Sequence, residues 1–181
     1  MENVSIHLGV PENNEEKSVM ELFDSEILTR IGDHLIKKKE SVAVAESVTA
    51  GLIQFAFSNT INAAKFFQGG ITAYNLGQKY KHLGVDPLHA MEVNCVSQEI
   101  AEQMAKQVTT NFSAHWAIAI TGYASPVPEG DSKLFAYYSI IHKSKIKAEG
   151  MIKCHDITPP QAQHFYVNRL LELFAELLHK K

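Results

Sequence analysis

The chain has 181 residues, of which 45% are hydrophobic and 20% are charged. This length suits one domain with a hydrophobic core, and the composition is that of an ordinary globular protein, which excludes a disordered or fibrous chain. The formal net charge of -3 is opposite in sign to that of proteins that neutralise nucleic-acid phosphates, so no nucleic-acid partner is expected.

The cysteines, the histidines and the apolar segments indicate a cytoplasmic protein without a metal site. Cys95 and Cys154 lie far apart and form no CxxC pattern, so neither a zinc site nor a disulfide scaffold is predicted. The nine histidines form no HxxxH or HExxH arrangement. No basic segment followed by an apolar one opens the chain, and no apolar run reaches membrane-spanning length. We therefore expect no cofactor and no contact with a membrane.

Hydrophobic periodicity predicts helices that alternate with strands. Apolar residues recur every three or four positions from Met20 to Leu35, which is typical of an amphipathic helix, whereas SVAVA at 41–45 is short and β-branched, which favours a buried strand. Residues 1–16 have little periodicity and are interpreted as an N-terminal arm, followed by a single α/β domain over residues 17–181. In chain order, the predicted elements are helix 19–39, strand 41–45, helix 50–58, strand 65–74, helix 76–84, helix 97–112, strand 115–122, a hairpin of strands 134–143 and 145–155, and helix 161–178.

Polar residues follow or close three of the predicted strands, at Ser47, Tyr74 and Thr121. In an open α/β sheet, ligands bind beyond the carboxyl ends of the strands, so we expect these side chains to converge. A helix that starts after Ser47 would also offer unpaired N–H groups and a positive dipole end to an oxyanion or a phosphate. Ser47 is thus a candidate nucleophile, but serine and threonine are preferred helix caps, and the sequence alone favours that simpler role.

Lys79 is the candidate base for such a serine. No His–Asp pair is visible near this element, and Lys79 follows Tyr74 by five residues on the predicted short helix. A lysine that is partly buried can lose its proton and accept one from a serine hydroxyl. The alternatives are a solvated surface lysine, a strand-end aromatic at Tyr74 and a strand-to-loop turn at Thr121. The residues by themselves indicate a pocket able to cleave an amide or an ester, and no more.

Four segments, in this order, resemble the C-terminal domain of the competence/damage-inducible CinA family, which includes nicotinamide mononucleotide deamidases of the PncC type. The family's Glu-Ser-Cys-Thr-Gly-Gly is matched by ESVTAG, and its Gly-Gly-x-x-x-Tyr, with a following Lys and Leu-Gly-Val, is matched by GGITAYNLGQKYKHLGV. Its Val-Ser before a long helix is matched by CVSQEIAEQMA, and its Ile-Thr-Gly strand end by AIAITGYASP. The similarity extends from about Ile27 to about Ile141.

The resemblance implies a fold, a reaction and a set of site residues. The fold is a three-layer α/β/α sandwich with a mixed sheet, in a domain that forms a homo-oligomer. The reaction is hydrolysis of nicotinamide mononucleotide to nicotinate mononucleotide and ammonia, a step of pyridine nucleotide salvage that needs no metal. Ser47 looks like the nucleophile, Lys79 like its general base and Tyr74 like a further catalytic residue, while N–H groups of residues 49–51 are expected to hold the oxyanion. The residues implied to bind the nucleotide-like carboxamide are Glu46, Thr49, Ala50, Gly51, Thr121 and Gly122.

Other segments depart from the family pattern. Val48 replaces the cysteine and Ala50 the first glycine of the turn, and the family's Ser-Asn-Glu is here Asn-Leu-Gly at 75–77. The glycine-rich loop after Ile-Thr-Gly has become YASPVPEGDSKLFA, and Gly-Asp-Arg-x-x-Val-Arg has become CHDITPPQAQ, without an arginine. These last two losses lie where a phosphate would be bound. Three possibilities follow: a deamidase that uses Lys133 or Arg169 instead, an amidase for another small substrate, or a catalytically weakened or inactive paralogue that serves binding or assembly.

Overall fold

The computed structural model describes residues 22–179, in which five strands form one mixed sheet of order β2-β1-β3-β4-β5. The strands are β1 (Val42–Glu46), β2 (Phe67–Thr72), β3 (Trp116–Tyr123), β4 (Leu134–His142) and β5 (Lys145–Cys154). β1 is parallel to both β2 and β3, whereas β4 is antiparallel to β3 and to β5. The arm predicted for residues 1–16 lies outside the described residues, as do the first residues of the helix predicted over 19–39.

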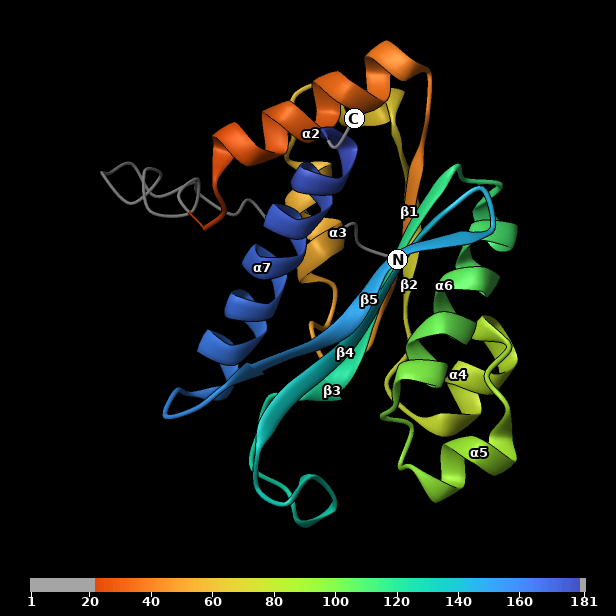
Figure 1. The fold of residues 1–181 in the computed structure, drawn as a ribbon, viewed down its shortest axis with the longest axis vertical. Helices are drawn as coiled ribbons and strands as arrows, with labels where there is room; N and C mark the ends of the chain where they lie inside the picture. Colours follow the sequence, from red (N-terminus) through yellow and green to blue (C-terminus); the bar gives the residue numbers. More distant parts are fainter. Residues whose placement is uncertain (1–21, 180–181) are drawn as a thin grey trace, which may run out of the picture.

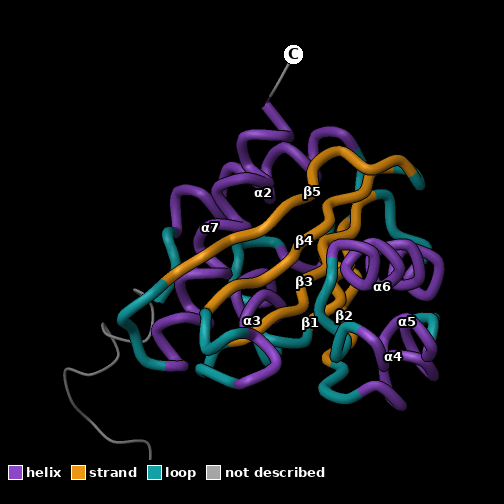
Figure 2. Tube along the Cα trace, turned by 60° about the horizontal axis from the view of Figure 1, so that its bottom comes forward, coloured by secondary structure: helices purple, strands orange, loops and turns teal. Residues whose placement is uncertain are grey.

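Helices cover both faces of this sheet (Figure 1). On one face lie α2 (Ser25–Lys38), α3 (Leu52–Ser58) and α7 (Pro159–His179), and on the other lie α4 (Leu76–Leu83), α5 (Pro87–Glu92) and α6 (Gln98–Phe112). Figure 2 shows the strands between these two groups of helices. The expected three-layer α/β/α sandwich with a mixed sheet is confirmed. Among the helices of residues 22–179, none is both long and apolar enough to cross a membrane.

The two faces of the central strands carry side chains of different size. Successive side chains of a strand point to opposite faces, and in β1 and β3 those toward α2, α3 and α7 are large, whereas those toward α6 are alanines. The large set is Val42, Val44, Trp116, Ile118 and Ile120, and the alanines are Ala43, Ala45, Ala117 and Ala119. The small side chains leave space for α6 to lie close to the sheet.

Most predicted elements are present, and the differences have local causes. α5 is absent from the predicted elements because six residues are too few for a periodic pattern, although Asp86 caps it and Pro87 is its first residue. The helix predicted over 161–178 begins two residues earlier, at Pro159, and Gln161 Oε1 accepts a hydrogen bond from the backbone N–H of Thr158 at 2.8 Å. The predicted hairpin turns at Lys143 and Ser144, which both have positive φ.

The turn between β1 and α3 holds two successive residues in the left-handed region. Ala50 has a φ of 53° and Gly51 a φ of 99°, so α3 starts at Leu52 rather than at the predicted residue 50. Glycine adopts this conformation without strain, whereas the Cβ atom of alanine costs roughly 1–2 kcal/mol there. Ala50 is exposed, so packing of its methyl group does not offset this cost.

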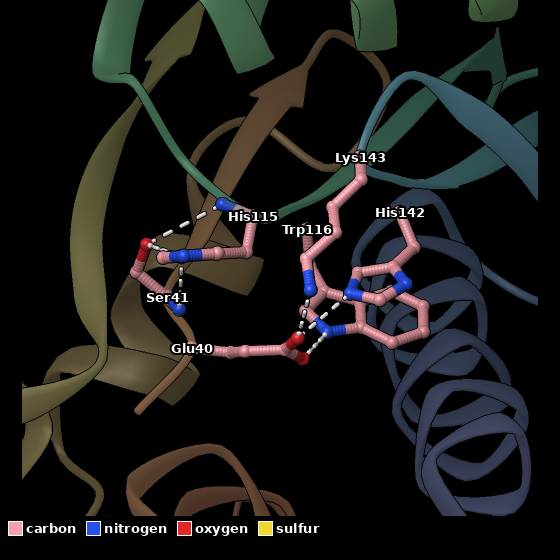
Figure 3. A network of polar contacts seen from close by, with 6 residues as sticks. All are labelled: Glu40, Ser41, His115, Trp116, His142 and Lys143. Carbon is pink, nitrogen blue, oxygen red and sulfur yellow. Dashed lines mark hydrogen bonds and ion pairs between the residues drawn. The ribbon is translucent and has the colours of Figure 1, made fainter. Parts of the chain in front are cut away.

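A polar network joins the amino-terminal ends of β1 and β3 to the β4–β5 turn (Figure 3). Glu40 accepts a hydrogen bond from Trp116 Nε1 at 2.7 Å, and its other carboxylate oxygen lies 2.9 Å from both His142 Nε2 and Lys143 Nζ. The rings of Trp116 and His142 stack with centroids 4.1 Å apart. Burial by itself would raise the pKa of Glu40, but the hydrogen bonds from Lys143, Trp116 and His142 outweigh it and lower that pKa to about 2.

We expect Glu40→Gln to reduce the free energy of unfolding at neutral pH by about 1–3 kcal/mol, because three donors lose a charged acceptor. The pKa of Glu40 falls from 4.5 to about 2 on folding, so this contribution is complete above pH 4.5 and is lost as the pH falls toward 2. Denaturant unfolding of both proteins at neutral pH and near pH 3 measures it. The exposed Glu176→Gln serves as control. A deficit that does not shrink in acid would contradict the network's role.

We expect Ala50→Gly to raise the free energy of unfolding by about 1 kcal/mol, because glycine relieves the strain of the left-handed backbone. Ala64 is also exposed but has a negative φ, so Ala64→Gly should instead lower the stability. Urea unfolding at equilibrium compares the two variants. Destabilisation by both substitutions would show that the positive φ of Ala50 carries no strain.

Candidate active site

A cavity of about 460 Å³ opens at the carboxyl ends of β1 and β3. β1 continues through α3 on one face of the sheet to β2, and β2 continues through the helices of the other face to β3. Ligands of open α/β sheets bind at such a switch point. The cavity walls come from the β1–α3 turn, the β2–α4 segment, the α5–α6 loop, β3 with the loop that follows it, and the start of α7.

Five of the nine predicted site residues line this cavity, namely Ser47, Lys79, Tyr74, Thr121 and Gly122. They meet there because β2, β1 and β3 run parallel and end at the same edge of the sheet. The residues at the strand ends therefore lie together at one cavity. The chemical role of each depends on the contacts that its side chain makes.

Lys79 is buried in the cavity wall. Only 3% of its surface is exposed, and within residues 22–179 its Nζ forms no ion pair and makes one long hydrogen bond, of 3.5 Å, to the carbonyl oxygen of Tyr74. Burial lowers the pKa of Lys79 below its ordinary value of 10.5, and the electrostatic interaction with Cys95 opposes this shift. A lysine with a lowered pKa is more often neutral, which is the form that accepts a proton.

The side chain of Ser47 is not the cap of α3. Its backbone N–H donates to Ile120 O at 3.1 Å, which ties the turn to β3, and the residue lines the cavity. Within the described part of the chain, the Ser47 hydroxyl makes no hydrogen bond, and none joins it directly to Lys79 Nζ. The hydroxyl is therefore available to a ligand.

The buried carboxylate of Glu46 holds the start of α3. One oxygen accepts from Thr49 Oγ1 at 2.6 Å and from the N–H groups of Gly51 and Ile53, both at 3.1 Å. The other accepts from the N–H of Gln54 at 2.9 Å. A side chain that precedes the helix by several residues thus satisfies donors that a helix cap would normally satisfy.

This arrangement places four of the predicted substrate-binding residues outside the cavity lining. Glu46, Thr49, Ala50 and Gly51 do not line the cavity. Glu46 and Thr49 are fully buried and bonded to each other, and the N–H of Gly51 is used by Glu46, so it cannot hold an oxyanion. Among the described residues, the backbone N–H groups of Val48 and Thr49 make no hydrogen bond, and of these two residues Val48 lines the cavity.

The other predicted residues shape the cavity in different ways. The Tyr74 side chain is 83% exposed at the cavity mouth. Thr121 is buried, and its Oγ1 donates to the carbonyl oxygen of Cys95 at 2.8 Å, which holds the α5–α6 loop against β3. At Gly122, an added Cβ atom would lie 2.2 Å from Phe135 O, so only glycine fits against β4. Thr121 and Gly122 therefore fix the walls rather than present polar groups.

The cavity also includes residues that the sequence pattern did not indicate, among them Asn94, Tyr123, Glu129 and Gln163. Asn94 Nδ2 donates to the Tyr123 hydroxyl at 3.1 Å, and Gln163 Nε2 donates to Val48 O at 2.9 Å. Glu129 lies in the Pro- and Gly-rich loop after β3, and a loop next to a strand end was the signal that could have located it. Within residues 22–179, no group of three or more His, Cys, Asp or Glu side chains could hold a metal ion.

Neither of the two cations considered for phosphate binding lies at the cavity. Lys133 Nζ pairs with Asp131 at 3.4 Å, and Arg169 pairs with Glu172 along α7. Neither Lys133 nor Arg169 is among the cavity-lining residues. Neither side chain is therefore placed at this cavity to replace the arginines that the family pattern contains.

Residues 24–149 match the family model of the CinA C-terminal domain. A CinA-like protein of Prochlorococcus marinus (strain NATL1A) is 38% identical over 99 residues, which are 55% of this chain and 23% of that protein. The nicotinamide-nucleotide amidohydrolase PncC of Pseudomonas putida is 34% identical over 100 residues, 55% of this chain and 62% of that protein. The matched region thus spans less than a quarter of the first relative and less than two thirds of the second.

Solved structures share the fold. The competence damage-inducible protein A of Klebsiella pneumoniae has a TM-score of 0.80 and 21% identity over 87% of this chain and 98% of that one. A CinA superfamily protein of Enterobacter cloacae has a TM-score of 0.78 and 22% identity over 96% of this chain and 99% of that one. Because the family model matches well over half of its residues, this chain belongs to the CinA C-terminal domain family.

Proposed function

We propose that the protein is an amidohydrolase that acts on a small carboxamide through Ser47 and Lys79. The supporting observation is that one cavity is lined by a serine with an unengaged hydroxyl and by a buried lysine with a lowered pKa and no ion-pair partner among residues 22–179. The name of the Pseudomonas putida relative, a nicotinamide-nucleotide amidohydrolase, supports a carboxamide as the reacting group and the nicotinamide mononucleotide family as the first substrates to test.

In the proposed reaction, neutral Lys79 accepts the Ser47 proton while the serine oxygen attacks the carboxamide carbon. The negative charge of the tetrahedral intermediate is held by the free N–H group of Val48, which lines the cavity. Lys79 then returns the proton to the leaving nitrogen, which departs as ammonia and leaves an ester on Ser47. A water molecule, deprotonated by Lys79, hydrolyses this ester, which releases the carboxylic acid and restores the serine hydroxyl.

Tyr74 has two roles in this proposal. Its carbonyl oxygen accepts the hydrogen bond from Lys79 Nζ and so orients the base. Its exposed ring lies at the mouth of the cavity, where it offers an apolar face to a planar substrate. When substrate binds, we expect the 3.5 Å contact between Lys79 Nζ and the Tyr74 carbonyl oxygen to shorten and Ser47 and Lys79 to move closer together. Catalytic hydrogen bonds often tighten only in the complex.

The second candidate is a CinA-like paralogue that binds a ligand or takes part in an assembly without catalysis. The missing direct hydrogen bond between Ser47 and Lys79 favours it.

For both candidates we propose a cytoplasmic homo-oligomer. The apolar side chains of α5 support an interface, because Leu88 is 73% and Met91 71% exposed.

Ser47→Ala and Lys79→Met are expected to reduce ammonia release from nicotinamide mononucleotide or nicotinamide riboside by at least about a thousandfold, because each removes a partner of one proton transfer. Lys81→Met, an exposed lysine on the same helix, should retain activity. A coupled ammonia assay at high enzyme concentration gives the rates, and circular dichroism checks that the variants fold. Equal activity of wild type and Ser47→Ala would refute the nucleophile, and no release from either compound would favour the second candidate.

The rate at low substrate, kcat/KM, is expected to rise with pH, because only neutral Lys79 can accept a proton. Burial lowers the pKa of Lys79 from 10.5, so the midpoint of this rise should lie below 10.5. Arginine stays protonated throughout, so Lys79→Arg should be inactive at every pH. A pH profile measured in buffers of constant ionic strength tests this. A profile that shows no rise anywhere from acidic to alkaline pH would exclude Lys79 as the base.

A further inference from the structure

The cavity offers almost no positive charge to a ligand. Among the described residues that line it, Lys79 is the single cation and Glu129 the single carboxylate. In the proposed function Lys79 acts as a neutral base at the reacting group. The remainder of the substrate therefore meets a wall whose one charged group is an acid.

Backbone N–H groups at helix starts are the usual alternative for binding a phosphate. The start of α3 is occupied by Glu46, whose carboxylate takes up its N–H groups. α7 meets the cavity at Pro159, which is followed by Pro160, and neither proline has an N–H. At α4, Asn75 Oδ1 already accepts from the N–H of Gln78 at 3.1 Å. The start of α3 is thus taken up by Glu46, the first two residues of α7 have no N–H to donate, and one N–H of the α4 start is capped by Asn75.

A compact turn holds Glu129 at the cavity. Glu129 is the middle residue of the 3-10 helix Pro128–Gly130, and two N–H groups of this turn, those of Gly130 and Ser132, donate to Val127 O at 3.1 and 2.9 Å. Gly130 lies against the ring of Tyr123, where an added Cβ atom would be 2.7 Å from Cδ2. The backbone position of Glu129 is therefore set by packing on β3, and its side chain is exposed at the cavity.

We propose that the cavity selects a carboxamide without a phosphate group, a nucleoside-like compound rather than a nucleotide, and that Glu129 determines this specificity. The inference rests on the proposed function for the identity of the reacting group. A phosphate dianion would be repelled by Glu129 and would find no arginine to pair with. A pyridinium cation would instead be attracted by this carboxylate and by the rings of Tyr74 and Tyr123, which also line the cavity.

Calorimetric titration of nicotinamide riboside and nicotinamide mononucleotide tests the selectivity, because both contain the same pyridinium carboxamide and differ in the phosphate. The full chain with Ser47→Ala is used so that neither compound is hydrolysed. We expect the riboside to bind at least about fivefold more tightly, and added Glu129→Lys to shift the ratio about fivefold toward the mononucleotide at low salt. The control is Glu176→Lys, the same charge change at an exposed position about 25 Å along α7 from Pro159.

Tighter binding of the mononucleotide, binding of neither compound, or a Glu129→Lys shift no larger than that of Glu176→Lys would each overturn the proposal. Ammonia release by the wild-type protein is measured in parallel. Selective binding of the riboside without ammonia release would support the specificity and contradict the hydrolysis. Release from the mononucleotide with tighter mononucleotide binding would do the reverse, so the two proposals fail separately.

Discussion

The buried carboxylate of Glu46 is the interaction on which the candidate site depends. An uncompensated charge in a protein interior is very costly, but four donors from the α3 start and its turn compensate this one. Because Glu46 does the work of a helix cap, the neighbouring Ser47 keeps its hydroxyl free. The same contacts fix the angle at which the chain leaves β1. One side chain therefore both anchors a short helix and leaves a reactive group at the sheet edge.

The parallel register of the central strands supplies the rest of the site. Glu46 pairs with Thr72 on β2 and with Ile120 on β3, so β1 and β2 end level with each other, while β3 continues to Tyr123 at the same edge of the sheet. The segments that follow these ends then surround one cavity, into whose wall α4 places Lys79. Burying a lysine without a charged partner costs stability, and here that cost is the source of its altered basicity. The unfavourable burial and the proposed chemistry are two aspects of the same position.

Periodicity and strand-end chemistry predicted the layered fold and the convergence of Ser47, Tyr74 and Thr121, because both follow from rules that hold for any open α/β sheet. The role of Glu46 could not be predicted, since it depends on a turn with two positive φ values that no periodic pattern encodes. The loop residue Glu129 was also missed: it lies four residues before Lys133, and only the folded turn shows that the acid, not the cation, reaches the cavity.

The unequal faces of β1 and β3 imply that the two halves of the core accept natural variation differently. On the α6 side, an alanine enlarged by even one or two carbon atoms would force the helix away from the sheet, so that layer should change only by substitutions in the helix itself. On the α7 side, exchanges among valine, isoleucine and leucine can be absorbed by neighbouring large side chains. The side of the sheet that faces α7 can therefore vary among large apolar residues, whereas the side that faces α6 is restricted to the smallest residues.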